Sequence, residues 1–119
     1  MIERDRLLQA AVDETGLLDF GDKGFRQPLD LLIDALNGEA RLNDFGRFRA
    51  EYTISAGLCN RLKIYDYLQK HPEVENARVD KPIFIVGLPR TGTTALHHML
   101  NQDDSNHTLR LWEAQNPVP

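Results

Sequence analysis

The residues with the clearest chemical potential form the stretch GLPRTGTT at residues 87–94. It follows the apolar run IFIV at residues 83–86 and precedes ALHHML, a stretch that favours a helix. The order of strand, tight loop and helix is typical of phosphate-binding loops, in which backbone amides at a helix N-terminus converge on an oxyanion and glycine lets the backbone approach it closely. Thr93 and Thr94 can add hydroxyl donors. We therefore predict an anion-binding loop.

The loop departs from the nucleoside triphosphate motif G-x-x-x-x-G-K-[ST] at one position. Gly87, Gly92 and Thr94 are kept, but Thr93 stands where the lysine should be and the cation lies earlier, at Arg90. In a kinase or ATPase that lysine reaches the β- and γ-phosphates beside a bound magnesium ion, so its absence weakens this assignment. A P-loop kinase or NTPase with an atypical loop stays an alternative, and it predicts magnesium-dependent ATP binding.

The segment PIFIVGLPRTGTT, residues 82–94, resembles the 5′-phosphosulfate-binding loop of sulfotransferases that use 3′-phosphoadenosine 5′-phosphosulfate (PAPS), in particular the bacterial Sulfotransfer_3-type family. The segments GLLDFGD, ARLND and NRLKIYDYLQKHPE before it and LRLWEAQNPVP after it are also similar, so the resemblance covers essentially the whole chain. It implies an α/β, P-loop-like sulfotransferase fold and transfer of a sulfuryl group from PAPS to an acceptor hydroxyl or similar nucleophile. The class of small-molecule acceptor stays open.

The resemblance also implies roles for individual residues of the loop. The expected cofactor-binding residues are Pro89, Arg90, Thr91, Gly92, Thr93 and Thr94. Amides from Thr91 to Thr94 would bind phosphate oxygens, and Arg90 would be catalytic by stabilising the charge that builds on the bridging oxygen as the sulfuryl group leaves. Because the transferred group carries less negative charge than a phosphoryl group, we expect no metal ion.

The acceptor hydroxyl needs a general base, and Glu113 in the segment LWE is the catalytic candidate. The related tyrosylprotein sulfotransferases resemble this layout, with a glutamate at a comparable distance beyond the loop arginine. The alternative is that Glu113 is a solvated surface carboxylate. The histidines do not have the spacing of a metal site, because His97 and His98 are adjacent and point to different sides of a helix.

The pattern ahead of the loop predicts a helical N-terminal region over residues 1–80. We expect a helix that Gly16 ends, a second from about Pro28 to Gly38, and a third from Asn43 or Asp44 as N-cap to about Gln69. The predicted apolar faces comprise Ile2, Leu7, Ala11 and Val12, then Leu29, Leu32, Ile33 and Leu36, then Ile54, Leu58, Leu62, Tyr65 and Leu68. The triplet DFG at residues 19–21 and 44–46 is interpreted as turn and cap residues, because the other protein-kinase motifs are missing.

Composition sets the remaining expectations. The chain has 119 residues, of which 41% are apolar and 27% charged, and its net charge of −4 argues against broad nucleic-acid binding. The longest apolar run is far shorter than the roughly 20 residues of a membrane span, and the N-terminus lacks the apolar core of a signal peptide, so we expect a cytoplasmic protein. The single cysteine, Cys59, is expected to be a packed side chain.

Residues 81–119 are expected to be only the start of the PAPS-binding α/β domain, with a strand, the phosphosulfate loop and a helix. A complete sulfotransferase has a later strand and helix that bind the 3′-phosphate of the cofactor, and one strand cannot form a sheet. The chain is therefore predicted to be the N-terminal part of a larger enzyme, mostly helical as a fragment. A truncated, non-catalytic helical binding module is the other alternative.

Overall fold

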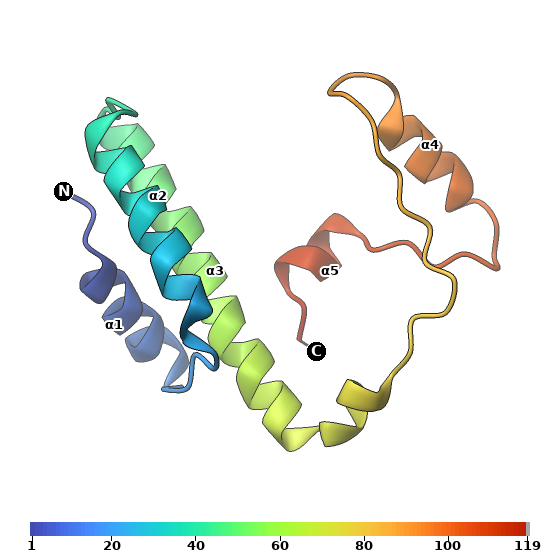
Figure 1. Ribbon diagram of the computed structural model, residues 1–119, viewed down its shortest axis with the longest axis horizontal. Coiled ribbons are helices and arrows are strands. Elements are labelled where there is room, and N and C mark those ends of the chain that lie inside the picture. Colours follow the sequence, from blue (N-terminus) through green and yellow to red (C-terminus); the bar gives the residue numbers. More distant parts are fainter. Residues whose placement is uncertain (119) are drawn as a thin grey trace.

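The computed structural model describes residues 1–118 and shows a group of helices followed by a long irregular segment and two short helices (Figure 1). The helices are α1 (Arg4–Thr15), α2 (Arg26–Gly38), α3 (Asp44–Lys70), α4 (Thr93–Leu100) and α5 (Leu111–Gln115), with 3₁₀ turns η1 (Lys23–Phe25) and η2 (Pro72–Asn76). In Figure 1, α1 and α2 lie along α3, whereas α4 lies on the other side of the molecule.

The three predicted N-terminal helices are confirmed, and the predicted boundaries lie within two residues of those observed. Gly16 ends α1 in the left-handed region at φ 70°, where glycine pays no Cβ penalty, and its amide donates to the carbonyl of Val12 at 2.8 Å. Asn43 is the N-cap of α3, and its Oδ1 accepts a hydrogen bond from the amide of Gly46 at 2.8 Å. The helix α3 ends at Lys70, two residues before Pro72.

The buried core lies entirely in the helical region. Its residues are Ile2, Leu7, Ala11, Leu29, Ile33, Leu58, Cys59 and Leu62. The prediction was wrong for Leu32, which is 47% exposed because the buried stripe of α2 follows Leu29 and Ile33, one helical turn apart. Burial raises the pKa of the Cys59 thiol, which is therefore a packed and unreactive group at neutral pH, as expected.

Arg61 ties the connection between α1 and α2 to α3, a role that the sequence pattern did not reveal. Its guanidinium donates to the carbonyls of Phe20 at 2.7 Å and Asp22 at 2.8 Å. The same group lies 4.3 Å from the centre of the Phe25 ring, a cation–π distance. A planar guanidinium can satisfy two carbonyls and an aromatic face at once, which a lysine ammonium cannot.

The predicted strand at residues 83–86 is not formed, and residues 1–118 contain no β-strand. A strand exists only through hydrogen bonds to a neighbour, and none of the described residues supplies one. Ile83, Phe84 and Val86 are 65%, 83% and 91% exposed. The Cα radius of gyration is 17.6 Å, against about 13.5 Å for a compact domain of this length. The fragment is thus mostly helical, as expected, and its C-terminal third has no core of its own.

No helix within residues 1–118 has both the length and the apolar character needed to cross a membrane.

The first DFG triplet forms a tight turn against α3. The amide of Gly21 donates to Oδ1 of Asp19 at 2.8 Å, and Gly21 has φ 69°. A Cβ atom on Gly21 would lie 1.9 Å from a ring carbon of Tyr65. The second triplet contributes the first residues of α3. Both triplets are turn and helix-start residues, as interpreted.

We predict that Gly21→Ala lowers the free energy of unfolding by about 2–4 kcal/mol, because it adds left-handed strain to a clash with Tyr65. Gly38→Ala is the matched control, since its Cβ would meet no atom within 4 Å, and it should leave stability unchanged or raise it by up to about 1 kcal/mol. Urea unfolding followed by circular dichroism measures both. Equal stabilities for the two variants would contradict the packing described.

Candidate functional site

The loop before α4 presents unpaired backbone amides to solvent. Helix α4 begins at Thr93, and Gly92 precedes it with φ 94°. No side chain among the described residues caps this end, and the first backbone bond of the helix joins the amide of Leu96 to the carbonyl of Gly92 at 3.0 Å. The amides of Thr93, Thr94 and Ala95 therefore remain available to an anion, with the positive end of the helix dipole behind them.

Two contacts within the loop hold it in this shape. The hydroxyl of Thr91 donates to the carbonyl of Leu88 at 2.6 Å, so Thr91 bridges the turn by its side chain. A Cβ atom on Gly87 would lie 3.0 Å from both Oγ1 of Thr91 and Cγ2 of Thr93. A larger residue at position 87 would therefore press on the side chains of Thr91 and Thr93, where the loop returns closely on itself. The sequence motif indicated a glycine here, but it did not show that Thr91 has a structural contact.

Arg90 adopts a backbone conformation that a non-glycine residue rarely takes. Its φ is 66°, in the left-handed region, and such a residue costs about 1–3 kcal/mol. Its side chain makes no hydrogen bond or ion pair with any described residue. The strained backbone thus carries a permanently charged guanidinium that is free to bind a ligand.

These groups surround a hollow of about 360 Å³, which we call the loop hollow. Its lining residues are Arg90, Gly92, Thr93, Thr94 and Ala95. The lining contains one cation, two hydroxyls and the free amides at the start of α4, and it contains no carboxylate. Such a set of donors fits a phosphate or sulfate group, which offers only acceptor oxygens.

Four of the six predicted cofactor-binding residues line the loop hollow, namely Arg90, Gly92, Thr93 and Thr94. Pro89 and Thr91 belong to the same turn but do not line it; the hydroxyl of Thr91 is used inside the loop. These residues therefore divide into those that line the loop hollow and those that belong to the turn beside it.

Glu113 lies away from the loop hollow, on α5. Its Oε2 accepts a hydrogen bond from the amide of Arg110 at 2.6 Å, which caps the N-terminus of this short helix. The carboxylate is partly exposed, so its other oxygen can still meet a second partner. The structure thus gives Glu113 a structural contact that the sequence did not indicate. Its role as the general base stays a prediction.

The histidines lie in different parts of the structure. His97 and His98 are neighbours on α4, with ring centres 5.9 Å apart in an edge-on arrangement. His71 stacks on Tyr67 with ring centres 4.2 Å apart and contacts Glu73 through Nδ1 at 3.0 Å. A backbone hydrogen bond, together with this contact, lowers the pKa of Glu73. Among the described residues, no three potential metal-ligating side chains gather into one group.

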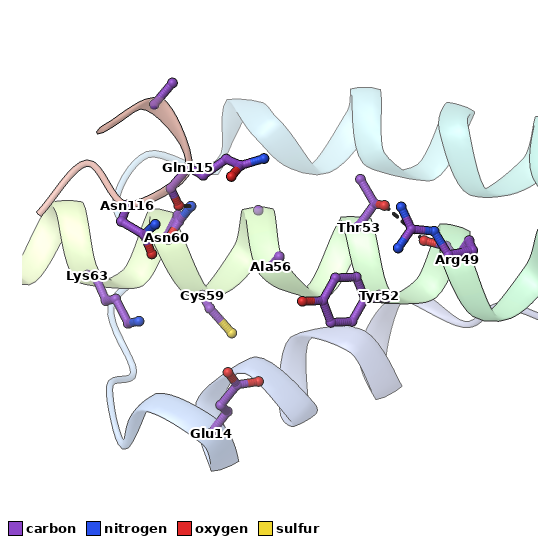
Figure 2. A pocket seen from close by; sticks show the side chains of 12 residues that line it. Glu14, Arg49, Tyr52, Thr53, Ala56, Cys59, Asn60, Lys63, Gln115 and Asn116 are labelled. Atoms are coloured by element: carbon purple, nitrogen blue, oxygen red, sulfur yellow. Dashed lines mark hydrogen bonds between the residues drawn. The ribbon is translucent and has the colours of Figure 1, made fainter. Parts of the chain in front are cut away.

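A second hollow, of about 560 Å³, lies between α1, α3 and α5 and contains none of the predicted site residues (Figure 2). We call it the α3 groove. Its lining residues are Glu14, Arg49, Tyr52, Thr53, Ala56, Gly57, Cys59, Asn60, Lys63, Ala114, Gln115 and Asn116. Charges of both signs occur along it, so it lacks the anion preference of the loop hollow.

Comparisons with known proteins agree with the loop geometry. The family model described as "Sulfotransferase family" matches residues 82–119. The crystal structure of the sulfotransferase STF1 of Mycobacterium tuberculosis H37Rv is 36% identical, with a TM-score of 0.93 over 99% of this chain and 33% of its own. That of the sulfotransferase STF9 of Mycobacterium avium is 34% identical, with a TM-score of 0.91 over 100% of this chain and 30% of its own.

This chain therefore spans about a third of the length of each solved sulfotransferase that it matches, at their N-terminal part. A comparison with curated proteins found no match. The sequence prediction of a sulfotransferase N-terminal portion is confirmed by these findings.

The geometry predicts that Gly87→Ala weakens anion binding by the loop at least about tenfold, because the added Cβ displaces Thr91 and Thr93 and, with them, the amides at the start of α4. Inorganic pyrophosphate, titrated into the chain by calorimetry, is the probe. Gly57→Ala is the control, since a Cβ there meets nothing within 4 Å. Pyrophosphate affinity that is the same in both variants would show that the close return of the loop is unimportant for binding.

Proposed function

We propose that this chain is the N-terminal part of a sulfotransferase, because a sulfotransferase family model and two solved sulfotransferases match it, and that the full-length protein transfers a sulfuryl group from PAPS to an acceptor hydroxyl or similar nucleophile. The observation that carries the proposal is the loop hollow, in which Arg90 and the amides at the start of α4 face the same space. The cytoplasmic location expected from the sequence forms part of the proposal.

The fit to a phosphosulfate rests on the donors present. Amides of Thr93, Thr94 and Ala95 and the two threonine hydroxyls provide several hydrogen-bond donors around one hollow. PAPS, when bound, supplies the sulfuryl group and a good leaving group, a phosphate. Only donors and a cation are needed to hold such a group, and the lining of the loop hollow consists of these.

In the proposed reaction, the acceptor oxygen forms a bond to sulfur while the bond from sulfur to the bridging oxygen breaks. Negative charge builds on that bridging oxygen, and Arg90 is placed on the loop to stabilise it. The acceptor proton passes to a base, for which Glu113 is the candidate on this chain. Because a sulfuryl group carries less negative charge than a phosphoryl group, we expect this step to need no metal ion.

We predict that Arg90→Ala in the full-length protein lowers kcat by about 10²–10³-fold, the usual effect of removing one group that stabilises a developing oxyanion. Affinity for adenosine 3′,5′-bisphosphate, measured by calorimetry, should fall by less than about tenfold, because the amides still bind the phosphate. Arg78→Ala is the matched control, since Arg78 is an exposed arginine outside the loop hollow. Equal losses of kcat and nucleotide affinity in Arg90→Ala would contradict the proposed role.

Glu113→Gln separates the base from the helix cap. The amide oxygen of glutamine can still accept the hydrogen bond from Arg110, whereas the side chain can no longer take up a proton. If Glu113 is the base, kcat should fall by about 10²–10⁴-fold while thermal unfolding is unchanged. A variant with unaltered kcat would show that Glu113 serves only as the cap of α5, and the base must then be sought elsewhere in the full-length protein.

A further inference from the structure

One hydrogen bond joins the helical region to the part of the chain that carries the candidate site. The Nδ2 of Asn60 on α3 donates to the backbone carbonyl of Gln115 on α5 at 2.7 Å. Figure 2 shows the two residues side by side at one end of the α3 groove. Within residues 1–118, no other hydrogen bond or ion pair links residues 1–80 with residues 81–118.

The position of Asn60 on α3 suits this contact. Asn60 lies two residues from both Leu58 and Leu62, which are buried, so it projects about 200° away from each of them around the helix. Ala56 and Gly57 lie about one turn before it and form a shallow surface with room beside them. The Asn60 side chain can therefore reach the α5 backbone from the surface of α3 without disturbing the buried residues.

Helix α5 is too short to be stable by its own backbone hydrogen bonds, so we expect contacts outside it to matter. It has five residues, and helices shorter than about 12–15 residues are marginal in water on their own. Its N-terminus is capped from within by Glu113, but its last carbonyls have no partners further along the helix. Asn60 supplies a donor to one of these carbonyls, that of Gln115.

We propose that Asn60 is a positioning residue that fixes α5 on α3 and thereby sets the location of Glu113. Asn60 touches neither the loop hollow nor Glu113, so it acts only through the α5 backbone. The proposal has a structural half, the anchoring of α5, and a catalytic half that rests on the proposed function. The two halves are tested by different measurements.

The structural half is tested in the chain itself with Asn60→Asp, which keeps the shape of the side chain but removes the donor. We expect the amides of residues 111–116 to exchange with deuterium about five- to tenfold faster, because one hydrogen bond of ordinary strength is lost. Trp112 is the single tryptophan of the chain and lies on α5, so its fluorescence anisotropy should fall at the same time. Asn60→Gln, which retains an amide donor, should restore much of the wild-type anisotropy.

Thr53→Ala is the control on the same groove, because the Thr53 hydroxyl bonds only to the carbonyl of Arg49 in its own helix. Circular dichroism of each variant establishes that α1–α3 stay folded. If Asn60→Asp destabilises these helices, the same exchange measurement is made on Asn60→Gln, which has an amide donor, and on Asn60→Ala, which has none. Wild-type exchange at residues 111–116 in a donor-less variant would overturn the proposal.

The catalytic half is tested in the full-length protein. Asn60→Asp should lower kcat about tenfold with an unchanged KM for PAPS, and it should lower kcat no further when combined with Glu113→Gln, because both changes then act on the same group. Additive losses would overturn the link between Asn60 and Glu113. If the full-length protein transfers no sulfuryl group at all, the proposed function fails, whereas faster exchange of α5 in Asn60→Asp would still support the anchor.

Discussion

The unpaired amides at the start of α4 are the constraint around which the candidate site is arranged. A helix end without a capping side chain leaves several donors without partners, and the chain keeps them together by placing Arg90 and Gly92 at positive φ. Left-handed backbone at Arg90 costs about 1–3 kcal/mol, so the arrangement is maintained against a local preference. Gly87 and Thr91 stabilise it, the first by allowing the loop to return closely and the second by bridging to Leu88.

The helical region has a different physical basis. Its eight buried residues and the guanidinium of Arg61 hold α1, α2 and the turn between them on α3. The C-terminal part, by contrast, has no buried side chain in residues 81–118, and its apolar run at residues 83–86 is largely exposed. Within residues 1–118, the hydrogen bond from Asn60 is the only one that connects the well-packed helical region with the segment that contains α5.

Local sequence signals predicted the elements that depend on local physics. Gly16 as a helix end, Asn43 as an N-cap and the glycine-bounded loop before α4 all follow from the backbone preferences of single residues. The strand at residues 83–86 could not be realised because pairing is non-local and no partner lies within the described residues. The exposure of Leu32 and the capping role of Glu113 depend on which face a neighbour covers and on one side-chain rotamer, which periodicity alone does not specify.

We propose that the loop hollow binds a phosphosulfate and not the triphosphate of a kinase. Calorimetric competition between adenosine 3′,5′-bisphosphate in the presence of a chelator and ATP in the presence of magnesium, in the full-length protein, tests it most directly. We expect adenosine 3′,5′-bisphosphate to bind without metal and more tightly than ATP with magnesium. Tighter, magnesium-dependent binding of ATP would contradict this proposal and favour a nucleoside triphosphate enzyme with an atypical loop.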